Sequence, residues 1–316
     1  MDNNLKKLHE IIKKSKSAAL VGHIRPDGDC IGSCIAMKLA LGHGDIYIDG
    51  EIPQTFAYMP DVKNINNELT DKKYDLMIIM DCADENRLGK FTELRSNCKT
   101  VIAIDHHLNT TTPADLYVTD KTRASTGSIL YEFFKSAKIE ITHDMAVALY
   151  TAIASDTGCF MFSNTKSFEH RAVADLIDIG IDTEKINYHN FRVYQRENLP
   201  ALIHVLKNIQ LFHDGKISVI HLPYKTIKKL NIENDFRHKF QKYGEDMEGV
   251  AVSATISEKE RGKFHVSIRS HGDVNISTVC EIFGGGGHRN AAGFVAKGKY
   301  RDIMDRLLIE LKKVLP

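Results

Sequence analysis

The sequence has no pair of cysteines with the spacing Cys-x-x-Cys, although it contains six cysteines. We therefore expect no zinc site built from thiolates. Cys30 and Cys34 lie four residues apart on a predicted helix, and we interpret them as packing residues, with a metal or redox role as the alternative. Cys82 and Cys159 lie close in sequence to candidate ligands described below, and packing is again the favoured interpretation.

The sequence also has no excess of charge of either sign. Its 42 Lys and Arg residues nearly balance its 41 Asp and Glu residues, so the formal net charge is +1. Proteins that capture duplex nucleic acid present a strongly basic face. We therefore expect no duplex DNA partner, while a local basic patch stays open.

No run of apolar residues approaches the roughly 18 that a membrane-spanning helix needs. The first residues, 1–7, lack the long apolar stretch of a signal peptide. The sequence therefore predicts a cytoplasmic protein with no membrane partner. It contains no internal repeat and no low-complexity tract.

The chain has 316 residues, which exceeds the size at which a single core usually stops growing. We predict a catalytic domain over residues 1–181, a connecting helix or linker over 182–198 and a second, smaller α/β domain over 199–316. The sequence leaves open whether the chain forms a homodimer.

Apolar runs alternate with helical patterns in the first domain. The expected strands are 18–22, 45–48, 76–80 and 101–104, and the expected helices are 5–15, 30–41, 125–134, 144–154 and 167–179. This alternation indicates an α/β fold with a doubly wound, mainly parallel sheet. In the second domain we expect strands at 217–221, 249–256 and 264–270, and helices at 277–283 and 300–315.

The loop after the first strand carries three candidate metal ligands, His23, Asp27 and Asp29. Pro26 between them should bias Arg25 towards an extended conformation, and Gly28 should permit a sharp reversal between the two aspartates. A helix N-cap is the alternative, with Asp29 capping a helix that begins at residue 30. Capping does not explain the histidine or the first aspartate, so a metal site is favoured.

Three further sets of polar residues follow or end apolar segments. Asp81 follows the expected strand 76–80, the triplet Asp105-His106-His107 follows 101–104, and Asp156 follows the helix 144–154. Ligands in doubly wound sheets bind beyond the carboxyl ends of the strands, so these residues should converge on one site. Asp81 alone could equally begin a loop, and Asp156 alone could belong to a turn.

The charges favour two divalent ions. Four aspartates of the set, Asp27, Asp29, Asp81 and Asp156, sum to about −4, which two divalent cations would neutralise. Carboxylates mixed with a few imidazoles suit Mn²⁺ or Mg²⁺. Two such ions about 3.5–4 Å apart can activate a water molecule and stabilise a leaving oxygen. The residues therefore predict metal-assisted hydrolysis of a phosphoester.

A second candidate site lies near the end of the chain. Four glycines and a histidine follow one another there: Gly284, Gly285, Gly286, Gly287 and His288. A flexible linker is the alternative, but the run stands between an expected helix and an expected strand, which favours a loop whose backbone N–H groups bind an anion. Arg269 could grip a phosphate with two N–H groups. Arg123 and Ser125, with Thr126, are weaker candidates for phosphate contacts in the first domain.

Together these motifs resemble the DHH/DHHA1 phosphoesterase family. The resemblance rests on residues 22–33, Asp81, Asp105-His106-His107, residues 156–158 and residues 284–288, in this order along nearly the whole chain. At this length the chain resembles the stand-alone bacterial NrnA-type members. These degrade short oligoribonucleotides (nanoRNA), and many also remove the 3′-phosphate of adenosine 3′,5′-bisphosphate.

The resemblance implies a pair of Mn²⁺ ions, with Mg²⁺ as the alternative. One ion would be held by His23, Asp27 and Asp81, and the other by Asp29, Asp81, His106 and Asp156. His107 would face the scissile phosphate and Asp105 would orient an imidazole.

The second domain would hold the rest of the substrate through Arg269, the glycine run and His288. The expected activity is a two-metal phosphodiesterase and phosphatase acting on short single-stranded RNA or small nucleotides. A phosphodiesterase for cyclic di-AMP or its linear product pApA is the alternative within the same core.

Overall fold

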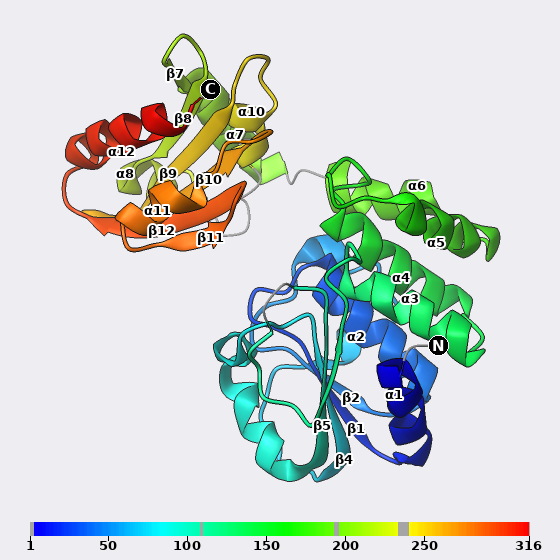
Figure 1. The fold of residues 1–316 in the computed structure, drawn as a ribbon. Coiled ribbons are helices and arrows are strands. Elements are labelled where there is room, and N and C mark those ends of the chain that lie inside the picture. Colours follow the sequence, from blue (N-terminus) through cyan, green and yellow to red (C-terminus); the bar gives the residue numbers. More distant parts are fainter. Residues whose placement is uncertain (1–2, 108–109, 193–195, 233–239, 316) are drawn as a thin grey trace. The chain divides into compact units, whose positions relative to one another are not determined.

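A computed structural model describes residues 3–107, 110–192, 196–232 and 240–315. The chain divides into two compact units, Met1–Val193 and Tyr194–Pro316, each with its own sheet (Figure 1). The division falls inside the segment 182–198 that the sequence marks as a connection. No helix in the described ranges has both the length and the apolar character needed to cross a membrane.

The first unit is built on a six-stranded parallel sheet in the order β3-β2-β1-β4-β5-β6. The strands are β1 (Ala18–Val21), β2 (Asp45–Tyr47), β3 (Ile65–Asn66), β4 (Tyr74–Met80), β5 (Cys98–Asp105) and β6 (Leu116–Thr119). β4 is almost wholly apolar and buried, as expected of a central strand covered on both faces. The predicted α/β fold with a parallel sheet is confirmed, and the strands at both edges, β3 and β6, were not predicted.

Alternate residues of the strands face two different cores. Leu20, Ile78 and Ile102 point to the helices α1 (Asn3–Lys14), α2 (Gly28–Leu41), α3 (Thr126–Ala137) and α4 (His143–Asp156). Ala19 and Met77 point to the opposite face, which is covered by the helical segment η3 (Glu85–Asn97). The sheet is therefore covered on both faces, as in a doubly wound fold. The short 3₁₀ segments η1 (Gln54–Phe56) and η2 (Val62–Asn64) belong to the loops.

The helix layer continues beyond α4. In Figure 1 the green helices α5 (Ser167–Asp178) and α6 (Thr183–Asn187) lie outside α3 and α4. A π-helical turn, η4 (Tyr188–Arg192), follows α6, and a 3₁₀ turn, η5 (Arg196–Asn198), precedes the second unit. The connection predicted for 182–198 is thus built from short helical pieces wherever it is described.

Glycines bring the helices beside the sheet into close contact. A Cβ atom on Gly28 would lie 2.7 Å from Cβ of Ser155 in α4, and one on Gly127 would lie 2.5 Å from Cβ of Ala152. Both distances are too short for real carbon contacts. The N-terminal ends of α2 and α3 can therefore approach α4 only because these positions lack a side chain.

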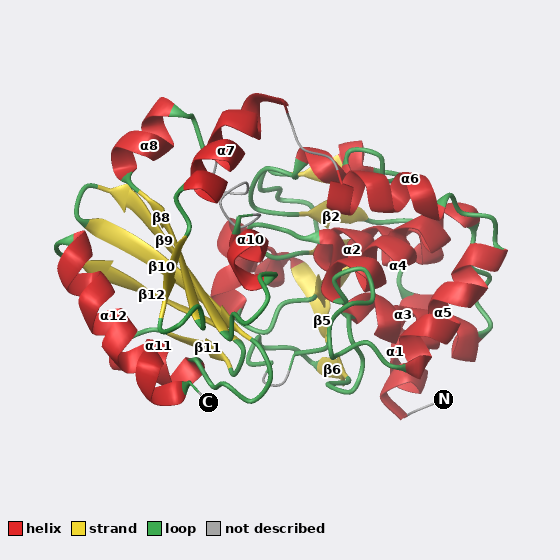
Figure 2. Ribbon diagram, turned by 90° about the horizontal axis from the view of Figure 1, so that it is seen from above, coloured by secondary structure: helices red, strands yellow, loops and turns green. Residues whose placement is uncertain are grey.

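The second unit has a mixed sheet in the order β11-β12-β10-β9-β8-β7, in which only the described pair β8–β9 is parallel. The strands are β7 (Gln210–Phe212), β8 (Ile217–Leu222), β9 (Val252–Glu260), β10 (Lys263–Ser270), β11 (Gly286–His288) and β12 (Ala291–Lys297). Helices pack on both faces of this sheet (Figure 2). They are α7 (Leu199–Lys207), α8 (Tyr224–Lys229) and α10 (Gln241–Glu245) on one face and α11 (Ser277–Ile282) and α12 (Tyr300–Val314) on the other.

Candidate metal centre

The candidate ligands lie where the strand order of the first unit reverses. β1 is followed in sequence by β2 on one side, whereas β4 pairs with the other side of β1. His23 follows β1, Asp81 follows β4, and Asp105 ends β5 next to β4. Such a reversal point leaves a crevice beyond the carboxyl ends of the strands. The structure thus brings residues from distant parts of the sequence to one end of the sheet.

The loop after β1 differs in detail from our expectation. Asp27, not Asp29, is the N-cap of α2, because its Oδ1 accepts the N–H groups of Asp29 at 3.1 Å and Cys30 at 3.0 Å. Gly28 is the first helical residue, so it makes no reversal, and its role is the close contact with α4 described above. Arg25 has φ 53° and is not extended, since the chain turns before Pro26 in order to enter the helix.

Asp29 is held by the N-terminus of a second helix, α3. Its Oδ2 accepts the N–H of Thr126 at 2.7 Å, and its Oδ1 accepts the N–H of Gly127 at 2.8 Å and the hydroxyl of Ser33 at 3.1 Å. The carboxylate is fully buried. Because a carboxylate offers about four lone-pair positions, one position remains for a further partner. The positive end of the helix dipole stabilises the buried charge.

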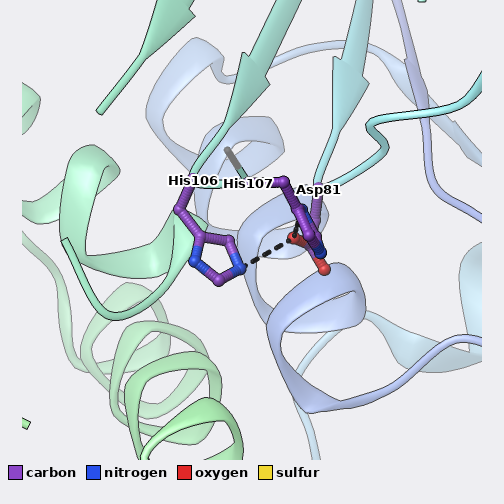
Figure 3. Close-up of side chains that lie close together, drawn as sticks. All are labelled: Asp81, His106 and His107. Atoms are coloured by element: carbon purple, nitrogen blue, oxygen red, sulfur yellow. Dashed lines mark ion pairs between the residues drawn. The ribbon is translucent and has the colours of Figure 1, made fainter. Parts of the chain in front are cut away.

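Asp81 lies at the centre of the site, between imidazoles. Its Oδ2 lies 3.4 Å from Nε2 of His23, and its Oδ1 lies 3.5 Å from Nε2 of His106 and 3.7 Å from Nδ1 of His107. Figure 3 shows His106 and His107 both directed at this carboxylate. Asp81 has φ 54°, a left-handed conformation that is uncommon for residues other than glycine. Strain of this kind is concentrated at functional sites.

His106 also approaches the two remaining aspartates. Its Nε2 lies 3.0 Å from Oδ2 of Asp156 and 3.8 Å from Oδ2 of Asp29. Asp156 is the last residue of α4, where the helix dipole disfavours an anion. A capping role therefore does not account for this aspartate, whereas a cationic partner does.

Asp105 makes a separate pair with His107. Its Oδ1 lies 2.6 Å from Nδ1 of His107 and accepts the N–H of that residue at 3.2 Å, and its Oδ2 accepts the hydroxyl of Thr110 at 2.6 Å. Asp105 is fully buried, whereas His107 is partly exposed. The aspartate therefore fixes the orientation of an imidazole that reaches the surface of the site.

Three groups of ligand atoms in the described residues lie close enough to share a cation. They are His23, Asp27 and Asp81; Asp29, His106 and Asp156; and Asp81, His106 and His107, with the atoms of each group within 4.8 Å of one another. The first two groups correspond to the two ligand sets that the resemblance implies, joined through the contact between Asp81 and His106. In the third group, Nδ1 of His107 is already held by Asp105.

The electrostatics of the site favour added positive charge. Burial raises the pKa of Asp156 to about 6, although its contact with His106 opposes this, and burial and the charge of Asp81 raise the pKa of Asp29 well above its usual value. Burial also acts against charge on His106, but Asp156 and Asp81 raise its pKa to about 12. Asp29 is fully buried and Asp156 partly buried, and the negative charges of neighbouring carboxylates raise the pKa of both, a condition that bound divalent ions would relieve. The donor set of carboxylates and imidazoles therefore fits divalent metal ions.

The second candidate site lies in the second unit. Arg269 is partly exposed in β10, on the face opposite to the buried side chains of Val266 and Ile268, and its guanidinium contacts the carbonyl of Ile268 at 3.2 Å. The glycine run is not a loop throughout, since Gly286–His288 forms the exposed edge strand β11. Close packing explains this difference: a Cβ on Gly287 would lie 2.6 Å from Cα of Ala292 in β12.

The two weaker candidates of the first unit have other partners. Arg123 donates two hydrogen bonds to Oε2 of Glu132, at 2.8 and 2.7 Å, and its guanidinium lies over the ring of Phe168. Ser125 is fully buried and is the N-cap of α3, where its hydroxyl accepts the N–H of Ser128. Both residues therefore have structural roles in this unit, and their phosphate contacts stay predictions.

Several residues that support the site were not predicted in these roles. Thr126 was considered only as a phosphate contact, but its N–H holds Asp29 and its hydroxyl donates to Asp81 at 3.2 Å. Ser33 was quoted only as part of a motif, and Thr110 was not considered. Arg87, whose Nη2 lies 3.0 Å from Nδ1 of His23, lies in a segment without a sequence signal. These contacts join residues far apart in sequence, so spacing could not reveal them.

Comparison with known proteins identifies both units. Residues 17–153 match the model of the DHH family, N-terminal domain, and residues 225–315 match the model of the DHHA1 domain. The chain belongs to the DHH/DHHA1 phosphoesterase family, which indicates a metal-dependent hydrolase. Asp156 lies just beyond the first matched segment, and its place in the site comes from the geometry.

The chain is similar to curated proteins over most of its length. It is 28% identical over 295 residues to the "Bifunctional oligoribonuclease and PAP phosphatase NrnA" of Thermus thermophilus, covering 92% of this chain and 87% of that protein. It is 28% identical to the protein of the same name from Mycoplasma pneumoniae, covering 89% of this chain and 88% of the relative. A crystal structure of an exopolyphosphatase-related protein from Bacteroides fragilis has the same fold, with a TM-score of 0.91, 21% identity and coverage of 98% and 96% of the two chains.

Proposed function

We propose that this protein is a Mn²⁺-dependent phosphoesterase that hydrolyses short oligoribonucleotides and adenosine 3′,5′-bisphosphate by a two-metal mechanism. The observation that carries the proposal is the position of Asp81, whose two oxygens face His23 on one side and His106 on the other. One carboxylate of this kind can join two cation sites. The names of the similar curated proteins supply the substrates.

The ligands divide into two sets around that carboxylate. His23, Asp27 and Asp81 would hold one ion. Asp29, Asp81, His106 and Asp156 would hold the other. Bound divalent ions would neutralise the charge of the substrate phosphate and lower the pKa of a water molecule.

His107 is the residue that we assign to the reacting phosphate. Because Asp105 holds Nδ1 of His107 at 2.6 Å, the proton on this ring is stabilised at Nδ1 and the ring is fixed in orientation. Its Nε2 is then the atom that would donate to, or accept from, an oxygen of the substrate. Asp105, which is buried, acts through His107 and not on the substrate.

The second unit would bind the part of the substrate that does not react. β11 is an edge strand of its sheet, so the outer side of Gly286–His288 is not paired with another described strand. Exposed backbone N–H groups of glycines can approach an anion closely. Arg269 and His288 would add charged or polar contacts to the same substrate.

The direct test is a substrate panel assayed with Mn²⁺ and with chelator. The panel contains labelled di- to pentaribonucleotides, adenosine 3′,5′-bisphosphate, cyclic di-AMP and pApA. We expect turnover of the short RNAs and the bisphosphate that is lost with chelator. Faster turnover of cyclic di-AMP or pApA would identify the alternative function, and no turnover of any compound would refute the proposal.

Paired histidine variants connect turnover to the site. His106→Ala removes an imidazole that contacts Asp156 and Asp81, whereas His143→Ala removes an exposed imidazole at the other end of α4. We expect a loss of more than about a hundredfold in kcat for the first variant, because metal ligands and their support are worth that much. The second variant should retain full activity. Activity that survives in His106→Ala would contradict the ligand assignment.

A further inference from the structure

Arg87 lies beside the candidate metal site, where its guanidinium contacts the imidazole of His23. The guanidinium of Arg87 has no carboxylate within ion-pair distance among the residues that the structure describes. Two other arginines of the same unit are paired with carboxylates: Arg95 lies 3.3 Å from Glu85, and Arg123 lies 2.7 Å from Glu132. A guanidinium carries five N–H donors and no acceptor, so it seeks an anion.

The backbone around Arg87 fixes where the side chain starts. Its carbonyl oxygen accepts the N–H of Ile24 at 2.6 Å, and its own N–H donates to the carbonyl of Asp84 at 2.9 Å. The segment η3 is therefore tied directly to the loop that carries His23 and Asp27. These two bonds use backbone atoms alone, so they persist when the side chain is replaced.

The contact of Arg87 with His23 cannot satisfy the guanidinium once the histidine binds a cation. Nδ1 of His23 lies 3.0 Å from Nη2 of Arg87 and 2.9 Å from the carbonyl oxygen of Ile24. One ring nitrogen cannot both accept from the guanidinium and donate to the carbonyl. Nε2 faces Asp81 and Asp27, so a cation would take the lone pair of Nε2 and leave the proton on Nδ1. Nδ1 then donates to Ile24, and the N–H group of Arg87 loses its acceptor.

The candidate metal site is exposed to solvent at Asp27, four residues from the His23 that Arg87 contacts. Asp27 is half exposed, in contrast to the buried Asp81 and His23. An anionic ligand of the metal pair would enter on this exposed side, within reach of a long, flexible arginine.

We infer that Arg87 is a substrate-binding residue, whose guanidinium binds a non-bridging phosphate oxygen of the substrate beside the His23–Asp27–Asp81 ligand set. The inference deepens the proposed function and rests on it for the identity of the substrate as a phosphoester. A positioning residue would instead hold His23 in place for the metal ion. Its replacement would weaken metal binding equally with and without phosphate present.

The test is equilibrium binding by calorimetry on the full chain, first of Mn²⁺ alone and then of AMP to the Mn²⁺-loaded protein. The variants are Arg87→Ala and Arg87→Lys, which keeps the charge but not the fork of donors. Lys90→Ala is the matched control, because it removes a basic group of the same segment that is paired with Asp49 at 3.5 Å. Thermal unfolding verifies that each variant folds.

We expect Arg87→Ala to weaken AMP binding on the order of tenfold to a hundredfold, the range for one charge-assisted hydrogen bond. Mn²⁺ affinity should stay within about threefold, since no metal ligand is removed. Arg87→Lys should fall between wild type and Arg87→Ala, and Lys90→Ala should match wild type.

Each other outcome overturns the inference. Equal AMP affinity in Arg87→Ala and wild type would show that Arg87 makes no contact with the phosphate. A fall in Mn²⁺ affinity with AMP affinity retained assigns Arg87 to the positioning of His23. Failure of the wild-type protein to bind AMP also refutes the inference. The proposed function is judged separately by turnover of the substrate panel, so AMP binding that depends on Arg87 without any turnover would refute that function alone.

Discussion

Manganese should stabilise this protein against heat through the first unit. The ligands come from residues 23–29, 81, 106 and 156, which only folding brings together, so the ion binds the folded state in preference to the unfolded chain. At a Mn²⁺ concentration of about a hundred times Kd, binding adds about 2.7 kcal/mol to the free energy of unfolding. For a unit the size of Met1–Val193, each kcal/mol corresponds to about 2–4 °C in Tm. The expected shift for one ion is therefore about 5–10 °C.

The assay is differential scanning calorimetry of the full chain over a series of Mn²⁺ concentrations. His106→Ala should lose most of the Mn²⁺-dependent shift, whereas His143→Ala should keep it, because only the first histidine lies beside Asp156 and Asp81. The quantity to compare between variants is the rise in Tm that Mn²⁺ causes. The Tm of the metal-free protein is not compared, because His106→Ala changes that value as well. A wild-type Tm that does not respond to Mn²⁺, or an equal shift in His106→Ala, would show that these residues do not form the binding site.

Three further predictions concern proton transfer, metal removal and the glycine strand. Asp105 raises the pKa of His107 through their hydrogen bond. If His107 acts in its protonated form, kcat should fall as pH rises through that pKa, and in Asp105→Asn the same decline should begin at lower pH, with kcat reduced by about 10²–10⁴-fold. An unshifted pH–rate profile in Asp105→Asn would exclude this role. Dialysis against chelator should abolish turnover, and added Mn²⁺ should restore it. Elemental analysis verifies that the dialysed protein is free of metal, and activity that persists in this protein would exclude the two-metal mechanism. Gly287→Ala should lower the free energy of unfolding of the second unit by more than about 1 kcal/mol and raise KM, because Gly287 has φ 146° and its Cβ would collide with Ala292. Gly286→Ala, where a Cβ meets no neighbour within 4 Å, is the matched control for denaturation, and an equal loss of stability in both variants would contradict the packing argument.

The central strands and the candidate ligands could be predicted because burial leaves a strong signal in sequence. Residues 76–80 of β4 form an unbroken apolar run that Asp81 follows directly, and β5 ends at Asp105. The short edge strands β3, β6, β7 and β11 could not be predicted, since each has two to four residues and few buried side chains. Their pairing is decided by neighbours that are distant in sequence.

The details of the loop after β1 were mispredicted because contacts with distant parts of the fold override the local sequence preferences there. The residue before a proline usually avoids helical and left-handed regions, yet Arg25 is left-handed. Asp29 looks like a helix cap by its position, but the N-terminus of α3 binds it, and Asp27 caps α2 instead. Arg87 had no signal at all, because its contact with His23 spans 64 residues of sequence.

We expect the choice of metal ion to depend also on positions that carry no ligand. Gly28 and Gly127 let α2 and α3 lie against α4, and so set how closely the carboxylates of Asp29 and Asp156 approach. A single methyl group at either glycine would separate these elements and enlarge the cage between them. Because Mg²⁺ demands a tight octahedral shell and larger ions tolerate longer bonds, such a change should alter ion selectivity while every coordinating group stays in the sequence. A search for determinants of metal preference in this protein should therefore begin with its helix contacts as well as its ligands.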